Sequence, residues 1–170
     1  GNSFSITPED GNGNIVPLGT KYTWTVTPAA GISGASNQTT GGINISQTLS
    51  NSTSAPVNVI YSVTATSGTS PNTCSNTFTV TVTVNPIPTT LSLTNQSYCN
   101  GVTTSVIPFT NLVTGTTYAW TNSNTAIGLP ASGTGDIPSF TATNAGTSPI
   151  SGTISVIATA NGCPRTAETF

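Results

Sequence analysis

Apolar and polar residues alternate strictly over residues 79–84, where Thr and Val follow each other three times. A period of two places every apolar side chain on one face of a β-strand, whereas a helix needs a period of 3.6. Similar shorter runs are separated by clusters of Gly, Asn, Ser and Pro, which favour turns. No helical stripe follows a helix-start signal. The pattern predicts strands near residues 3–7, 14–18, 20–27, 42–49, 57–66 and 76–85, and a weaker one near 32–36.

A group of motifs from the first half of the chain returns in the same order in the second half. The most distinctive is Tyr-x-Trp, at Tyr22 and Trp24 and again at Tyr118 and Trp120. Such ordered matches, with little drift in spacing, indicate a duplicated unit with insertions in its loops. The other matches are Gly19-Thr20 with Gly115-Thr116, residues 42–46 with 135–140, residues 62–66 with 155–159, Cys74 with Cys163, and Thr77-Phe78 with Thr169-Phe170.

A proline-containing segment, residues 85–88, separates the two copies. Proline cannot donate to a β-ladder and restricts φ, so this segment is predicted to be a short, stiff linker. We therefore predict an all-β chain of two tandem β-sandwich domains, residues 1–86 and 87–170. The second copy stops before a counterpart of residues 79–84, so we expect it to lack its last strand. The sequence is accordingly expected to be a segment of a longer protein.

The Tyr-x-Trp motifs supply the predicted core anchors, Tyr22, Trp24, Tyr118 and Trp120. Residues two positions apart in a strand point to the same face, and a Trp on a central strand commonly anchors a sandwich core. The alternative is a glycan-stacking platform, which would need the same rings to be exposed to solvent.

Charge is nearly absent, with two basic and four acidic residues and a formal net charge of −2. Soluble domains usually carry about a quarter charged residues. This balance gives no electrostatic attraction to nucleic acid or to anionic lipid. No run approaches the ~18 apolar residues of a membrane span. We therefore expect neither a nucleic-acid partner nor membrane insertion.

The three cysteines, Cys74, Cys99 and Cys163, are too widely spaced for a C-x-x-C motif. Cys99 opens the second copy and Cys163 lies late in it, which predicts a disulfide between them in an oxidising compartment. Cys74 occupies the position that matches Cys163, but the first copy has no early cysteine. Cys74 is therefore expected to be a free thiol.

Asp10, Asn12 and Asn14 alternate in the way the first ligands of a calcium loop do. Ile15 stands where that loop needs Gly, and Lys21 stands where it needs a bidentate Glu. A Gly/Asn turn is therefore the preferred interpretation, with a weak calcium site as the alternative. No other metal and no cofactor is expected.

The sequence offers no catalytic constellation. Its four acids, Glu9, Asp10, Asp136 and Glu168, lie in different segments, whereas glycoside hydrolysis needs two carboxylates across a cleft. The chain has no His, which excludes a Ser/His/Asp triad and leaves the cysteines without a His base. We predict that the protein is not an enzyme.

Longer strings in the chain resemble the PKD-like repeats of very large surface proteins of Bacteroidota. The resemblance covers nearly the whole chain and is most specific over residues 127–144; residues 19–27, 78–86 and 161–163 also carry it. It implies immunoglobulin-like sandwiches, export by the type IX secretion system and display on the outer cell surface.

The resemblance favours non-catalytic stalk repeats of a long secreted adhesin used in gliding motility and surface attachment. The expected partners are neighbouring repeats of the same chain, with surface polysaccharide as a further candidate. A polysaccharide-binding module and an accessory domain of a secreted enzyme are the alternatives. Burial of Trp24 and Trp120 would remove the stacking platform that the polysaccharide alternative needs.

Overall fold

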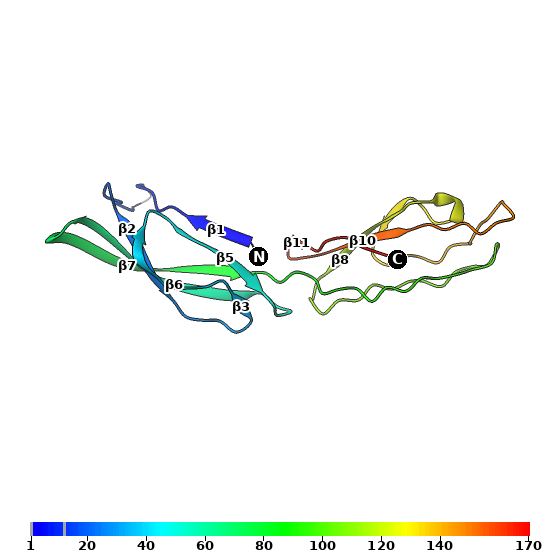
Figure 1. The fold of residues 1–170 in the computed structure, drawn as a ribbon, viewed down its shortest axis with the longest axis horizontal. Coiled ribbons are helices and arrows are strands. Elements are labelled where there is room, and N and C mark those ends of the chain that lie inside the picture. The colour runs from blue at the N-terminus through cyan, green and yellow to red at the C-terminus, as the bar shows by residue number, and fades with distance from the viewer. Residues whose placement is uncertain (1, 12) are drawn as a thin grey trace. The chain divides into compact units, whose positions relative to one another are not determined.

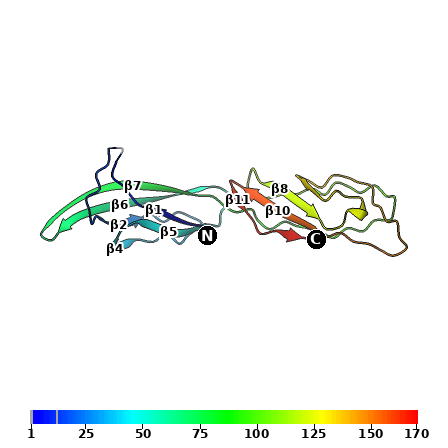
Figure 2. The ribbon, with the colours of Figure 1, turned by 90° about the horizontal axis from the view of Figure 1, so that it is seen from above.

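The computed structural model describes residues 2–11 and 13–170. The described chain is built from strands with one short 3-10 helix, so the predicted all-β class is confirmed. The chain divides into two compact units, Gly1–Asn85 and Pro86–Phe170 (Figures 1 and 2). Each unit has its own sheets and its own buried cluster.

The first unit consists of a four-stranded sheet, in the order β4-β2-β6-β7, and a three-stranded sheet, in the order β1-β5-β3. β6 and β7 form one long antiparallel hairpin of 13 residues a side. The strands are β1 (Asn2–Ile6), β2 (Lys21–Val26), β3 (Ile32–Ser33), β4 (Gln38–Gly42), β5 (Ile45–Asn51), β6 (Val57–Thr69) and β7 (Asn72–Val84).

Residues 14–18 do not form the strand predicted for them. Asn14 makes an isolated bridge to Gly11, and the side chains of Ile15 and Leu18 are fully solvent-exposed, at 88% and 103%. Pro17 also removes a ladder donor from this segment. Alternation alone predicted the strand, but no neighbouring strand takes up its apolar face.

The second unit has a five-stranded sheet in the order β11-β10-β8-β9, with β12 also pairing with β10. Its facing layer is irregular: residues 103–107 and 137–141 form the isolated bridges Thr103–Thr141 and Ile107–Ile137 and a hydrogen bond from the Thr104 N–H to the Phe140 carbonyl, and not a continuous ladder. The elements are β8 (Thr117–Asn122), η1 (Thr125–Ile127), β9 (Ser132–Thr134), β10 (Ile154–Ala160), β11 (Cys163–Pro164) and β12 (Glu168–Thr169).

The central strand pairs of the two units, β2 with β6 and β8 with β10, have the same register. Each Tyr-x-Trp strand places its Trp opposite a Val and its Tyr opposite an Ala. The pairs are Trp24–Val63 and Tyr22–Ala65 in the first unit, and Trp120–Val156 and Tyr118–Ala158 in the second.

In the last strands, the residues of the two units that correspond in the structure differ from those that the Thr-Phe motif aligned. Thr79 lies opposite Ser62, and Thr169 lies opposite Ser155, the residue that corresponds to Ser62. Phe170 is therefore the structural counterpart of Val80, two residues further along than the Thr-Phe motif indicated. The shift arises because β11 and β12 are two short strands, whereas β7 is continuous.

In the first unit the buried tryptophan and tyrosine also have polar partners. Trp24 Nε1 donates to the carbonyl of Ser36 at 3.0 Å, and Tyr61 Oη donates to Gln47 Oε1 at 2.9 Å. These bonds connect the four-stranded sheet to the segments that face it. The buried cluster is Tyr22, Trp24, Ile45, Leu49, Val59, Tyr61 and Val63.

In the second unit Trp120 packs against Gly133 of β9. A Cβ at position 133 would lie 2.2 Å from Trp120 Cζ2, so only glycine fits there. Trp120 Nε1 is buried without a hydrogen-bond partner among the described residues. The buried cluster is Leu91, Phe109, Trp120, Leu129, Ile137, Ile154 and Val156.

We expect Trp24→Ala and Trp120→Ala each to destabilise one unit by about 3–5 kcal/mol, because each removes a buried aromatic ring and leaves a cavity. Since each variant keeps one tryptophan, its fluorescence reports on the other unit during urea unfolding, while circular dichroism reports on both. The urea midpoint of the unmutated unit, followed by tryptophan fluorescence, is expected to equal that of the same unit in the wild type. If the midpoints of the mutated and the unmutated unit fell by the same amount in either variant, the two units would not have separate cores.

Candidate functional site

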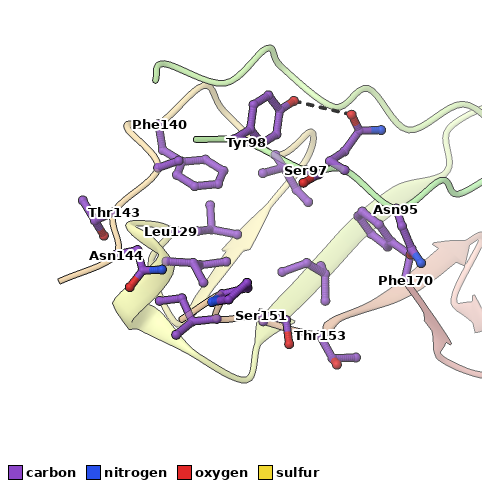
Figure 3. Close-up of a pocket in the computed structure, with 18 of the residues that line it drawn as sticks. Asn95, Ser97, Tyr98, Leu129, Phe140, Thr143, Asn144, Ser151, Thr153 and Phe170 are labelled. Atoms are coloured by element: carbon purple, nitrogen blue, oxygen red, sulfur yellow. Dashed lines mark hydrogen bonds between the residues drawn. The ribbon is translucent and has the colours of Figure 1, made fainter. Parts of the chain in front are cut away.

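A cleft of about 470 Å³ opens in the second unit between residues 95–100 and residues 149–154 (Figure 3). Its floor is apolar, and includes Leu129 and Ile137, which are 2% and 0% exposed. In Figure 3, Tyr98 and Ser97 lie on one side and Ser151 and Thr153 on the other. The cleft thus reaches from a polar rim down to the core.

Three separate parts of the fold place the floor of the cleft. Ile137 is fixed by its bridge to Ile107, and Ile127 closes the 3-10 helix η1. Phe170 follows β12 and pairs with Ile154 through two backbone hydrogen bonds of 3.0 and 3.1 Å. These residues are far apart in the sequence, so the cleft exists only in the folded unit.

Asparagine side chains hold the loops around the cleft. The buried Asn122 donates through Nδ2 to the carbonyls of Asn124 and Leu129, at 3.0 and 2.9 Å. Asn100 Oδ1 accepts from the backbone N–H of Asn144 at 3.0 Å, and both residues line the cleft. No sequence pattern distinguishes these side chains, because asparagine is abundant along the whole chain.

The chemistry that the cleft offers is neutral. The residues lining it contribute amides, hydroxyls, backbone groups and apolar side chains, but no carboxylate, ammonium or guanidinium group. Tyr98 is 38% exposed and is the exposed aromatic residue of the part of the chain that the structure describes. The cleft therefore suits an uncharged occupant that presents both apolar and hydrogen-bonding groups.

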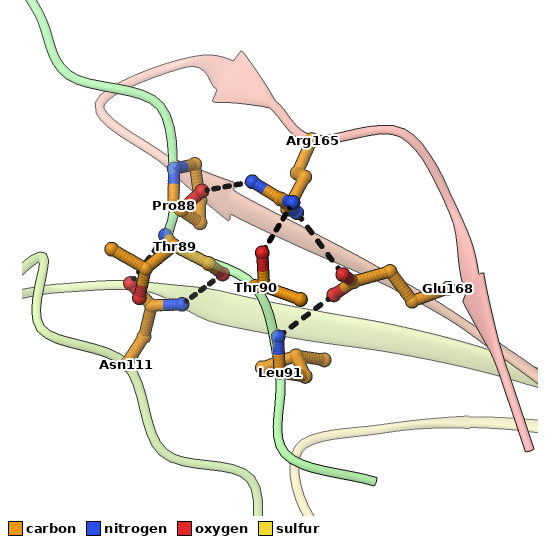
Figure 4. A network of polar contacts seen from close by, with 7 residues as sticks. All are labelled: Pro88, Thr89, Thr90, Leu91, Asn111, Arg165 and Glu168. Carbon is orange, nitrogen blue, oxygen red and sulfur yellow. Dashed lines mark hydrogen bonds and ion pairs between the residues drawn. The ribbon is translucent and has the colours of Figure 1, made fainter. Parts of the chain in front are cut away.

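A second polar feature of this unit is a network around Arg165, the one arginine of the chain (Figure 4). Its Nη1 donates to the carbonyl of Pro88 at 3.0 Å, and its Nη2 donates to Thr90 Oγ1 at 2.7 Å. Its Nε lies 3.3 Å from Glu168 Oε1. The other carboxylate oxygen of Glu168 accepts from the backbone N–H of Leu91 at 2.9 Å.

The same segment is held from its other side by Asn111. This side chain accepts from the backbone N–H of Thr89 at 3.0 Å and donates to the Thr89 carbonyl at 2.8 Å. Residues 88–91, which begin at the last residue of the predicted linker, are thus fixed to the second unit by side chains that bond to their backbone from both sides. No motif in the sequence indicated this network.

The structure buries three of the four predicted anchors and partly buries the fourth. Tyr22, Trp24 and Trp120 are 3%, 6% and 3% exposed, and Tyr118 is half-buried against Phe109 at a ring separation of 5.3 Å. Burial raises the pKa of Tyr118, and the charge of Asp136 raises it further. Neither Tyr-x-Trp motif can therefore act as a glycan-stacking platform.

The structure does not form the predicted disulfide, because Cys99 and Cys163 are both free, as is Cys74. Cys163 pairs with Ala160, beside the start of β8. The turn at Cys99 is bonded to Ala142, and the next residue, Thr143, is bonded to Ile127 of η1, which follows the other end of β8. A six-residue strand spans about 20 Å, far more than the ~4.4–6.8 Å between Cα atoms that a disulfide allows.

The predicted calcium candidates Asp10, Asn12 and Asn14 fall in the loop between β1 and β2, and Asn12 lies outside the described residues. One carboxylate oxygen of Asp10 accepts from the backbone N–H of Val16, and Asn14 pairs with Gly11 through two backbone hydrogen bonds of 2.9 and 3.2 Å. The described part of this loop is thus a hydrogen-bonded turn.

Two of the other acids, Asp136 and Glu168, also have structural partners. Asp136 Oδ1 accepts from the backbone N–H of Phe109 at 2.9 Å, and Glu168 belongs to the Arg165 network. Across residues 2–11 and 13–170, no group of three His, Cys, Asp or Glu side chains is placed to hold a metal ion. None of the helices described there is long and apolar enough to cross a membrane.

Comparison with known proteins places the first unit in a family. Residues 6–88 match the family model described as a PKD-like domain. No curated protein and no solved structure matches the chain. Domains of this immunoglobulin-like type are typically non-catalytic modules with structural or adhesive roles. A PKD-like domain is thus found over residues 6–88.

Proposed function

We propose that the chain is a pair of structural, non-catalytic repeats from the stalk of a long secreted bacterial adhesin. Its setting is the outer cell surface, after export by the type IX secretion system, in gliding motility and surface attachment. The observation that carries the proposal is the shared register of the β2–β6 and β8–β10 pairs. It supports a second copy of the PKD-like module that residues 6–88 contain.

The contacts within the second unit suit a module that bears load. Pro88 bonds to Arg165, and three residues later Leu91 bonds to Glu168, so the two segments run side by side in the same direction. Tension applied at the two ends of this unit would therefore shear these bonds together instead of breaking them one at a time. This is the loading expected of a unit linked in series to neighbouring repeats.

We expect stretching of single molecules to show two separate unfolding events, because each unit has its own core. Each event should lengthen the chain by somewhat less than about 30 nm, the extended length of 85 residues, Pro86–Phe170 or Gly1–Asn85. A single event that releases the whole chain, or an unfolding force too small to resolve for either unit, would contradict the stalk proposal.

Glu168→Ala is expected to lower the unfolding force of one event and leave the other unchanged. In solution it should destabilise the second unit by about 1–3 kcal/mol, because the buried Leu91 N–H loses its acceptor and Arg165 its ion pair. Thermal unfolding followed by circular dichroism measures the change. Glu9→Ala, at an exposed acid of the first unit, is the matched control and should change neither quantity.

Polysaccharide binding is the second candidate function, and the observation that favours it is the exposed Tyr98 ring at the edge of a neutral cleft. A glycan array separates the two candidates. The stalk proposal expects no saturable binding. Binding that Tyr98→Ala abolishes and Tyr22→Phe preserves would instead assign the polysaccharide function to the cleft.

A further inference from the structure

The cleft lies where the first unit has the end of its last strand. In the first unit β7 continues past Val80, so that Val82 lies opposite Val59 and Val84 lies opposite Val57. In the second unit Phe170 is the counterpart of Val80, and it pairs with Ile154, the counterpart of Tyr61. The counterparts of Val59 and Val57 are therefore Gly152 and Ile150.

Both of these residues line the cleft and present a free edge to it. The backbone N–H and C=O of Gly152 have no hydrogen-bond partner among the described residues, and Ile150 is 41% exposed. Ile154 and Phe170 exchange both of their backbone hydrogen bonds. In an antiparallel ladder the next such pair falls two residues along, which is at Gly152.

The opposite wall of the cleft is also placed to flank a strand. Residues 88–91 run beside residues 165–168, as the Pro88–Arg165 and Leu91–Glu168 contacts show. The chain continues from there into residues 95–98, which line the cleft across from Ser151 and Thr153 (Figure 3). The cleft is thus a slot that prolongs the path of β12, with the apolar floor beneath it.

We propose that this slot is a strand-acceptor site. Its occupant is an extended peptide segment in which β-branched apolar residues alternate with hydroxyl residues, continuing in register from Phe170 and antiparallel to residues 150–154. This is the chemistry that Thr81, Val82, Thr83 and Val84 supply in the first unit. Added strands of this kind gain affinity from backbone hydrogen bonds and specificity from alternate side chains that enter pockets. The proposal does not depend on the adhesin function.

The test appends Thr-Val-Thr-Val directly after Phe170 to a protein of residues 1–170. The two valines then face the floor, opposite Gly152 and Ile150, and the melting temperature of the second unit is expected to rise by about 4 °C or more. The amide of Gly152 should exchange with solvent at least about tenfold more slowly, because it gains an acceptor.

The matched control appends Val-Thr-Val-Thr, which has the same composition but turns its apolar residues to the other face. It should leave the melting temperature and the Gly152 exchange rate near those of the unextended chain. Equal melting temperatures for the two extended chains would overturn the proposal, as would unchanged exchange at Gly152 in the first of them. A strand from a second copy is the rival occupant; concentration-dependent dimerisation of the unextended chain, together with equal melting temperatures, would favour it.

Discussion

In each unit the strand that carries Tyr-x-Trp lies inside a sheet, with a partner on both edges. In that position, the register of the strand with its two neighbours determines which of its side chains point into the core. The register is the same in both units, with Trp opposite Val and Tyr opposite Ala. Because a slip of one residue would turn both aromatic rings to solvent, this pairing determines which side chains form each core.

The two units differ in the layer that faces the central sheet. The first unit faces its central sheet with three paired strands, whereas the second uses irregular segments joined by two isolated bridges. Asparagine side chains supply hydrogen bonds that a regular ladder would otherwise give, as Asn122 and Asn111 show. A module rich in Asn, Ser and Thr can therefore hold ordered loops with few charges.

Three of the few charged side chains have a structural role in the second unit. Arg165 and Glu168 connect residues 88–91 to the segment before and within β12, and Asp136 holds the backbone of Phe109. These contacts are separate from the cleft, whose lining carries no charged side chain. The few charges of the second unit thus hold its backbone segments in place.

The sequence by itself predicted the all-β class and the burial of Trp24 and Trp120, because a period of two is a local property of a chain. The duplication stays a prediction, and the shared register of the central strand pairs supports it. It could not determine which apolar runs find a partner, so residues 14–18 were predicted as a strand although Ile15 and Leu18 face solvent. An alternating sequence favours a strand with one buried face, but that face is buried only if another segment of the fold packs against it.

The tertiary structure alone decided the cleft, the Arg165 network and the separation of the cysteines. Arg165 and Pro88 are 77 residues apart in the sequence, and the walls of the cleft come from segments about 50 residues apart. Cys99 and Cys163 sit in one domain, as the sequence indicated, but the pairing of β8 with β10 places them beyond opposite ends of one strand. Such distances follow from strand pairing across the sheet, which spacing along the chain does not encode.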